Sequence, residues 1–177
     1  TTTVNGRRMF FAHVDGDERF TLMTSQPHLG PYAAFEHLLR NGPIDVPVFL
    51  CDQDDRWAPD KMQRLLTHIE SGSDAVFSAM RVVDEDGVVL RERFLGHEPT
   101  PDSLTPAHLL VMNCVSGAAL AISPRTVDAA LPFPARRLRG WHDQWLAAVA
   151  ARIGQVDYVS DPLVDYTTHG GQEIGRA

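Results

Sequence analysis

The sequence predicts an α/β fold in which helices cover a mixed, mainly parallel sheet that contains one antiparallel hairpin. Strand-like apolar runs alternate with helical patterns along most of the 177 residues, which is the order of elements in α/β proteins. One run, Val46–Cys51, is short and almost entirely apolar, as is typical of a strand buried on both faces of a parallel sheet. The turn-rich segment Asp84–Gly87 separates two further runs, as in a β-hairpin.

Two helices are expected in the first half of the chain. The first begins at Pro31, because proline is favoured at the first helical position, and ends about ten residues later at Gly42-Pro43. The second begins at Pro59 and stops near Ser71-Gly72. In each helix, apolar residues recur along one face. These residues are Ala34, Phe35, Leu38 and Leu39 in the first helix and Met62, Leu65, Leu66 and Ile69 in the second.

The middle of the chain predicts a hairpin, a strand and a short helix. Asp74–Val83 and Val88–Arg93 are expected to be the two arms of the hairpin. Cys114–Ile122 is expected to form a strand rich in small residues. Ser123 and Pro124 then start a short helix, as N-cap and first helical residue.

The C-terminal part predicts one long helix and two closing strands. The helix is expected over His142–Ile153, with Gly154 as a left-handed C-cap. Strands are expected at Val156–Val159 and Leu163–Tyr166, on either side of Asp161-Pro162.

No repeat or linker divides the sequence, so we expect a single domain over residues 1–177. Residues 1–27 carry the weakest signals. Within them, Arg8–Ala12 and Phe20–Met23 are expected to be short strands on either side of the Asp15-Gly16-Asp17 turn.

Composition and charge exclude several classes of partner. Sixteen Lys and Arg against 23 Asp and Glu give a net charge of −7, and because the basic residues form no stripe, we expect no nucleic-acid partner. No stretch approaches the roughly 18 apolar residues of a membrane span, so we expect no transmembrane segment, and no export signal is visible. Cys51 and Cys114 each lie in an apolar run, as buried reduced thiols do, which favours a cytoplasmic location.

The strongest chemical signal is the acidic turn Asp52-Gln53-Asp54-Asp55, directly after the first buried strand. Ligands of open α/β sheets collect at the carboxyl ends of strands, and Asp52 and Asp54, two residues apart on an extended chain, can face one ligand together. Their oxygens suit Mg²⁺ or Mn²⁺, which bridge carboxylates to substrate phosphates. A solvated acidic turn that caps the helix at Pro59 is the alternative.

Two other chemistries of an acidic turn can be compared with the same residues. An EF-hand starting at Asp52 would need Gly and Glu where this chain has Trp57 and Gln63, so a calcium loop is excluded. A Mg²⁺-dependent phosphohydrolase with Asp52 as nucleophile stays open, although Arg56 stands where that class has Thr or Val.

The second chemical signal is Trp141-His142-Asp143-Gln144-Trp145 at the start of a helix. Free backbone N–H groups and the helix dipole would hold the Asp143 carboxylate ionised and fixed there, as a general base must be. Ordinary capping by Asp143 is the alternative. His169, before Gly170-Gly171, is either a surface residue or the residue that completes a metal site begun by distant carboxylates.

Together these segments resemble the family 2 glycosyltransferases of the GT-A fold, in particular their rhamnosyltransferase-like branch. The resemblance keeps the family's order over residues 28–175, and the acidic stretch is its most specific part. The matching stretches are Leu29–Phe35, Phe49–Lys61, Asn113–Gly117, Leu131–Pro134, His142–Trp145, Pro162–Tyr166 and His169–Gly171.

The resemblance implies a GT-A-like enzyme, a metal-dependent inverting glycosyltransferase. Such an enzyme moves a sugar from a nucleotide-sugar donor to a hydroxyl of a carbohydrate or other acceptor. By resemblance, Asp52 and Asp54 are the two D-x-D acids, the first toward the ribose or the metal and the second on Mn²⁺ or Mg²⁺. Asp143 takes the place of the catalytic base.

The resemblance also implies roles for residues with weaker signals of their own. Ser116 and Gly117 would bind the donor by lining its sugar pocket, and Trp141 and His142 would contact the acceptor. His169 would be a metal ligand together with Asp54, as in some members of the family.

Residues 1–27 depart from the family's pattern, because the strand-end turns that hold the nucleotide base are not recognisable there. We therefore expect these 177 residues by themselves to bind nucleoside diphosphates weakly, to show little base selectivity and to carry out little or no transfer. We also expect an uncovered sheet edge, which favours self-association or a substitute strand from residues 1–27. A non-catalytic fragment or relic of such a domain, binding sugar or a protein partner, is the remaining alternative.

Overall fold

The computed structural model describes residues 2–4, 7–9, 18–19, 21, 29–43, 45–52, 54–135 and 141–168. The chain divides into two compact units, Thr1–Gly30 and Pro31–Ala177. In the first unit, β1 (Thr2–Val4) pairs antiparallel with β2 (Arg7–Met9). The sequence between these strands is Asn5-Gly6, a residue pair typical of tight hairpins.

This hairpin differs from the one expected from the sequence. Arg8 and Met9 are strand residues, but they pair with Thr3 and Thr2. The Asp15–Asp17 turn, around which pairing was expected, lies outside the described residues.

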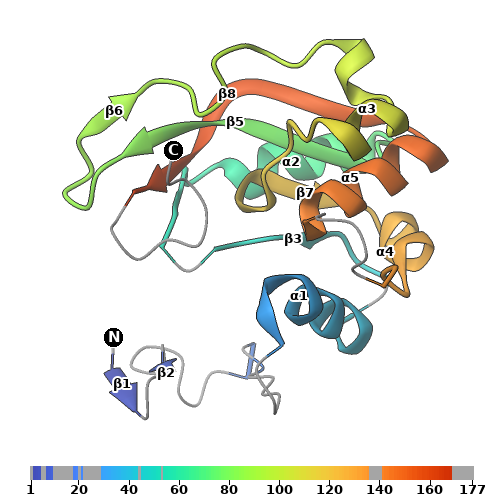
Figure 1. Ribbon diagram of the computed structural model, residues 1–177, viewed down its shortest axis with the longest axis horizontal. Coiled ribbons are helices and arrows are strands. Elements are labelled where there is room, and N and C mark those ends of the chain that lie inside the picture. Colours follow the sequence, from blue (N-terminus) through green and yellow to red (C-terminus); the bar gives the residue numbers. More distant parts are fainter. Residues whose placement is uncertain are drawn as a thin grey trace. The chain divides into compact units, whose positions relative to one another are not determined.

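The second unit is built on a mixed sheet of six strands (Figure 1). The strand order is β3-β7-β5-β8-β4, and β6 pairs with β5 beside this path. The strands are β3 (Val48–Phe49), β4 (Arg56–Trp57), β5 (Ala75–Val83), β6 (Val89–Arg91), β7 (Leu120–Ile122) and β8 (Val156–Thr167).

Only one pairing within the described sheet is parallel, so the expectation of a mainly parallel sheet is wrong. β5 and β8 run parallel along the whole of β5, whereas the β3–β7, β5–β7, β4–β8 and β5–β6 pairs are antiparallel. The reason is the place of β7, in which Ile122 pairs with Val48 on one side and with Ala75 on the other. β7 therefore separates two strands that run opposite to it. The mixed α/β class and the antiparallel hairpin are confirmed.

Two of the described helices begin where local capping signals place them. Ser123 accepts a hydrogen bond from the backbone N–H of Thr126, and Thr105 accepts one from that of His108. The helix after Thr105 was not expected, although Thr105-Pro106 repeats the Ser123-Pro124 signal. The α-helices of the described residues are α1 (Gly30–Asn41), α2 (Lys61–Glu70), α3 (Pro106–Val111), α4 (Pro124–Ala130) and α5 (His142–Ile153).

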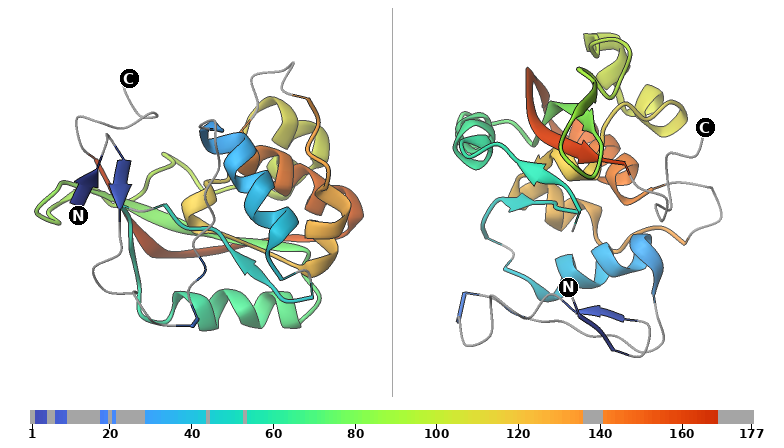
Figure 2. Two further views of the ribbon diagram at one scale, coloured as in Figure 1. Left: turned by 90° about the horizontal axis from the view of Figure 1, so that it is seen from below. Right: turned by 90° about the vertical axis from the view of Figure 1, so that its left-hand side faces the viewer.

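Helices cover both faces of this sheet (Figure 2). α2 lies on one face, and α3, α4 and α5 lie on the other. Alternate residues of β5 pack against the helices on opposite faces of the sheet, because successive side chains of a strand point to opposite faces. Ala75 and Phe77 pack in the larger core with α4 and α5, whereas Val76 packs against Leu65 of α2.

Four expected strands differ in extent from the observed ones. Of Val46–Cys51 only Val48–Phe49 forms a strand, and it is a partly buried edge strand rather than one covered on both faces. Of the expected strand Cys114–Ile122 only β7 forms, because a 3₁₀ turn at Gly117–Ala119 precedes it. The two expected closing strands are one continuous strand, β8, which accommodates Asp161-Pro162 through a register shift against β5.

The cysteines are free thiols with different surroundings. Cys51 is exposed, so its expected burial is wrong, and Cys114 is partly buried. The difference follows from the sheet, since Cys51 lies where the chain leaves an edge strand.

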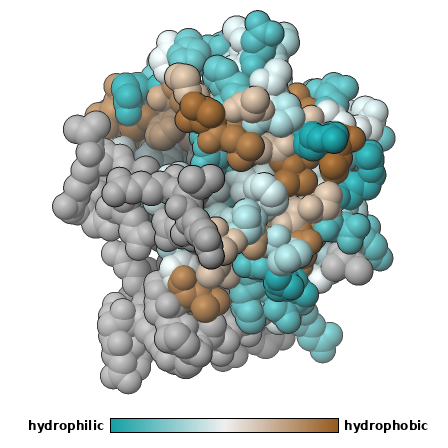
Figure 3. Space-filling model, turned by 45° about the vertical axis from the view of Figure 1, so that its right-hand side comes forward, coloured by the Kyte–Doolittle hydropathy of each residue, from teal (hydrophilic) through white to brown (hydrophobic). Residues whose placement is uncertain are grey.

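Apolar side chains reach the surface in several places on the face shown in Figure 3. Two consecutive runs of large exposed apolar side chains are Val88–Leu90 on the hairpin and Leu110–Met112 at the end of α3. No helix among the residues that the structure describes combines the length and apolar character of a membrane span.

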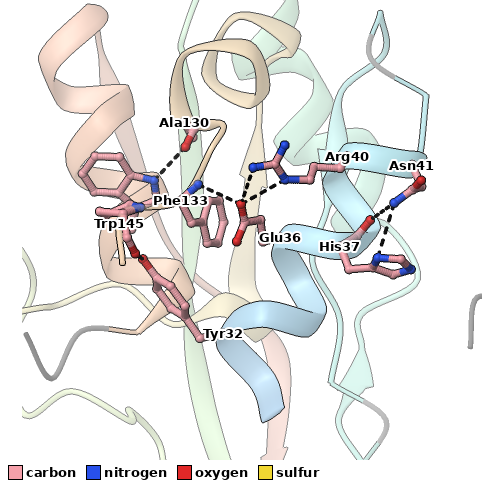
Figure 4. Close-up of polar contacts among 9 residues, drawn as sticks. Tyr32, Glu36, His37, Arg40, Asn41, Ala130, Phe133 and Trp145 are labelled. Carbon is pink, nitrogen blue, oxygen red and sulfur yellow. Dashed lines mark hydrogen bonds and ion pairs between the residues drawn. The ribbon is translucent and has the colours of Figure 1, made fainter. Parts of the chain in front are cut away.

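Polar contacts hold α1 against the segment that follows α4 (Figure 4). The Glu36 carboxylate accepts a hydrogen bond from the backbone N–H of Phe133 at 3.0 Å, and the rings of Tyr32 and Phe133 pack with centroids 5.1 Å apart. Beside them, the Trp145 indole of α5 donates to the backbone oxygen of Ala130 at 3.0 Å. α1 is thereby fixed beside α5, and it contributes a residue to the candidate site.

Gly154 ends α5 in an extended conformation, with φ −175°, so the expected left-handed C-cap is wrong. Glycine is required there by space instead, because a Cβ at this position would overlap Oδ2 of Asp74. Asp74 is 2% exposed and is held by the Ser123 hydroxyl at 3.1 Å and by Arg125 at 3.3 Å. The close approach of Gly154 therefore couples the end of α5 to the start of β5.

Gly154→Ala should destabilise the protein by about 1–3 kcal/mol, the usual cost of overpacking a buried site. Urea unfolding measures the change. Gly96→Ala is the matched control, because Gly96 is exposed and a Cβ there would have no neighbour within 4 Å, so its effect should stay within about 0.5 kcal/mol. Equal unfolding free energies for the two variants would contradict this account of Gly154.

Candidate functional site

The acidic turn lies where β3 leaves the edge of the sheet. Asp52 and Asp54 are both partly buried. Burial raises the pKa of Asp52, the charge of Asp54 raises it further, and Lys61 lowers it. The two acids predicted to face one ligand are therefore close enough to act on each other electrostatically.

Asp55, the third acid of the turn, joins it to the end of β8. Its Oδ1 accepts a hydrogen bond from the backbone N–H of Thr167 at 3.2 Å. Its Oδ2 is buried and has no hydrogen-bond partner among the described residues. Burial raises the pKa of Asp55 to about 7, although the bond from Thr167 lowers it. Sequence reasoning assigned no separate role to this residue.

Asp143 occupies the first turn of α5, as expected from the sequence. Its Oδ2 accepts a hydrogen bond from the backbone N–H of Gly117 at 3.0 Å. Its Oδ1 accepts from the backbone N–H of Gln144 at 2.6 Å and from the Asn113 side-chain amide at 3.3 Å. Burial raises the pKa of Asp143 to about 6, although the bonds from Gln144 and Gly117 favour the ionised form.

The two strongest sequence signals act on each other electrostatically. The negative charge of Asp52 contributes to the raised pKa of Asp143. The acidic turn after β3 and the carboxylate at the start of α5 therefore belong to one electrostatic environment.

His142 is buried next to Asp143. Its side chain is 8% exposed, and its ring stacks on Phe35 of α1 with centroids 3.7 Å apart. Neither ring nitrogen has a hydrogen-bond partner within the described part of the chain. A Cβ on Gly117 would lie 2.7 Å from Nε2 of His142, so the absence of a side chain at position 117 leaves space for the imidazole ring. Burial lowers the pKa of His142 to about 4, which keeps the ring neutral at neutral pH.

The other predicted site residues lie at the ends of the same elements. Ser116 is the N-cap residue of the 3₁₀ turn that begins at Gly117, and Trp141 is the N-cap residue of α5. Both side chains are partly buried. His169 lies outside the described residues, so its place relative to the acidic turn stays a prediction.

Lys61, the first residue of α2, is completely buried, whereas Met62, which was expected on the buried face, is exposed. The helix starts at Lys61 and turns this residue and Leu65, four residues on, toward the sheet. The Lys61 ammonium donates to the backbone oxygen of Ala118 at 2.6 Å and lies 3.6 Å from the centroid of the Trp57 ring. Burial lowers the pKa of Lys61 to about 8, and the acids of the turn oppose this shift.

The donor atoms of the acidic turn fit a divalent cation shared with a substrate. Carboxylate oxygens such as those of Asp52 and Asp54 suit Mg²⁺ or Mn²⁺, and Mg²⁺ needs only one or two of them because it keeps waters and binds substrate phosphates. The buried, unpartnered Oδ2 of Asp55 adds negative charge that a cation would offset. No group of three or more His, Cys, Asp or Glu side chains that could hold a metal occurs in the part of the chain that the structure describes.

No protein-family model and no curated protein matches this chain, and the function is inferred from the site residues.

Sequence reasoning missed Asn113 and Lys61, although both had weak signals. Asn113 is a single polar amide between the apolar residues Leu110–Met112 and Val115, where a polar side chain needs a partner. Lys61 is four residues before Leu65, so both residues lie on the same face of the helix. A charged residue at a buried helical position indicates a specific contact.

The low pKa of His142 makes the native state sensitive to acid. As pH falls from 6.5 to about 4, the unfolded chain takes up a proton at this residue and the native state does not, so stability falls over this range. The expected loss is about 3 kcal/mol, and it is complete below pH 4, where both states are protonated.

His142→Leu should remove this loss. Urea unfolding at several pH values measures the free energy of unfolding of each protein. Between pH 7 and pH 4, the free energy of unfolding of the variant should rise by about 3 kcal/mol relative to that of the unmodified protein. Asp55 and Asp143 have raised pKa values and oppose this trend, because their native forms gain protons first as pH falls, but both residues are present in both proteins. Parallel pH profiles would contradict the assignment to His142.

Proposed function

We propose that this chain is a metal-dependent inverting glycosyltransferase with a GT-A-like fold, which moves a sugar from a nucleoside-diphosphate donor to an acceptor hydroxyl. One observation carries the proposal. Asp143 is held by the backbone N–H of Gly117 at the start of a helix, and it lies close enough to Asp52 of the acidic turn to feel its charge. A fixed base beside a cation-binding turn suits proton removal from an acceptor next to a departing phosphate.

The acidic turn is proposed to bind the donor. Asp52 is directed toward the ribose or the cation, and Asp54 binds the cation, with His169 as the further metal ligand proposed from the sequence. Mn²⁺ or Mg²⁺ held there would neutralise the charge that develops on the departing diphosphate. Ser116 and Gly117 are proposed to line the pocket of the transferred sugar, since the 3₁₀ turn that they begin lies against Asp143.

Asp143 is proposed to be the general base. Its carboxylate takes the proton of the acceptor hydroxyl while the hydroxyl oxygen forms a bond to the anomeric carbon. The bond from that carbon to the diphosphate oxygen breaks on the opposite side, and its electron pair leaves with the nucleoside diphosphate, so the configuration inverts. The three hydrogen bonds to Asp143 fix its orientation, and its raised pKa makes it a stronger base than an ordinary aspartate.

Trp141 and His142 are proposed to form the acceptor side of the site, because they precede Asp143 directly. The two residues differ in what they offer. The ring nitrogens of His142 are buried in the described conformation, so this residue contributes by packing against Phe35 and beside Gly117. Trp141, which is partly buried, is the proposed direct contact.

Incubation of the purified full-length protein with a panel of nucleotide sugars and Mn²⁺ tests the proposal. Release of nucleoside diphosphate together with a glycoside, or with free sugar by donor hydrolysis, is the expected result. A phospho-enzyme at Asp52 without glycoside would identify a Mg²⁺-dependent phosphohydrolase instead. Donor binding without turnover would identify a non-catalytic relic.

Asp54→Asn should abolish Mn²⁺-dependent donor binding with little effect on stability, because strand-end acids of this kind serve ligands rather than the core. Calorimetric titration with a nucleoside diphosphate, with and without Mn²⁺, measures the loss. Asp128→Asn removes an acid from the exposed side of α4 and serves as the matched control. Metal-dependent binding that survives in Asp54→Asn would contradict the role of Asp54.

Asp143→Asn should lower kcat about 10²- to 10⁴-fold, the usual contribution of a general base, and leave donor affinity nearly unchanged. In the unmodified enzyme kcat/KM should rise with pH through about 6, because only the ionised carboxylate accepts a proton. Steady-state kinetics across pH 5 to 8 measure both effects. Preserved turnover with a large loss of donor affinity would place Asp143 in the donor site instead.

A further inference from the structure

Lys61 occupies a position that does not favour a charged residue. Its side chain is completely buried, and removing an ammonium from water is costly even when it is paired. It is also the first residue of α2, where the positive end of the helix dipole repels a cation. An apolar side chain of similar length, such as methionine, would fill the space without these costs. Packing alone therefore does not explain why a lysine occupies this position.

The contacts of Lys61 join segments that are separate in the sequence. The ammonium donates to Ala118 at 2.6 Å and lies 3.6 Å from the centroid of Trp57, the residue of β4 that pairs with Val164 of β8. The charges of Asp52 and Asp55 also act on it. Through these contacts Lys61 connects α2 and β4, the strand that directly follows the acidic turn, to the 3₁₀ turn before β7.

That 3₁₀ turn is the part of the chain that binds the proposed base. Ala118 is its middle residue, and the preceding residue, Gly117, donates its backbone N–H to Asp143 at 3.0 Å. One side chain therefore acts on both sides of the site. It holds the backbone that orients Asp143, and it lies in the field of the acids that are proposed to bind the donor.

We propose that Lys61 is a positioning residue, which fixes the acidic turn and Asp143 relative to each other by holding the 3₁₀ turn Gly117–Ala119 in place. The inference rests on the proposed function in treating Asp143 as the base and the acidic turn as the donor site. An ammonium suits this task because it donates directionally to the Ala118 oxygen and interacts with the ring face of Trp57, whereas an apolar side chain would only fill the space.

The test compares Lys61→Met with Leu65→Ala by nuclear magnetic resonance. Leu65 is also fully buried on α2, one turn further on, but it packs with Val76 and Ala121. Both variants weaken the packing of α2, and only the first removes the ammonium. The two variants are compared at urea concentrations at which their free energies of unfolding are equal. Under these conditions the Gly117 amide should exchange its hydrogen about ten-fold faster in Lys61→Met than in Leu65→Ala, because one hydrogen bond that protects this turn is lost.

Equal exchange of the Gly117 amide in the two variants, with its chemical shift unchanged from the unmodified protein, would overturn the proposal. Lys61→Gln keeps an N–H donor but removes the charge, and it should give an intermediate rate. If Lys61→Met does not fold, Lys61→Gln is compared with Leu65→Ala by the same criterion.

Mn²⁺ alone gives a second measurement that separates this inference from the proposed function. Mn²⁺ bound at the acidic turn should broaden the Gly117 amide signal in the unmodified protein and in Leu65→Ala, and broaden it less in Lys61→Met. Absence of broadening in the unmodified protein would contradict the metal role of Asp54. The hydrogen-exchange comparison would still decide the role of Lys61, because it requires neither metal nor donor.

Discussion

The parallel pairing of β5 with β8 is the interaction on which the rest of the sheet depends. It runs along the whole of β5 and is reinforced by an ion pair between Arg81 and Asp165 at 2.6 Å. β6 and β7 attach to β5, and β4 attaches to β8, while among the described strands β3 is joined only through β7. α5 leads into β8, with Gly154 packed closely against Asp74 at the start of β5. The position of Asp143, at the other end of α5, therefore follows from this pairing.

The sequence predicted the features that short-range signals determine. Capping by Ser123 and the apolar period of α5 are local, so α4 and α5 lie where they were expected. The direction of β7 was not predictable in this way, because it depends on Ile122 pairing with two strands that are distant in the sequence. The burial of Lys61 likewise depends on partners far along the chain, in the 3₁₀ turn before β7.

The same distinction applies to the candidate site. Asp52 and Asp143 were found separately, because an acid after a strand and an acid at a helix start are each local patterns. Their proximity, and the bond from Gly117 to Asp143, arise only when β7 and α5 pack together. Burial then raises the pKa of both acids. Shifted pKa values are common among the ionisable groups of functional sites.

The charge balance of this region supports the proposal that a cation binds together with the donor. Asp52, Asp54, Asp55 and Asp143 against Lys61 leave an excess of three negative charges when all are ionised. A diphosphate approaching such a surface alone would be repelled. Lys61 offsets only one of these charges, and its buried ammonium is already bound to Ala118. A divalent cation would attract the donor and also favour the ionised forms of Asp52 and Asp55, so its binding should release protons, as metal binding to protonated ligands does.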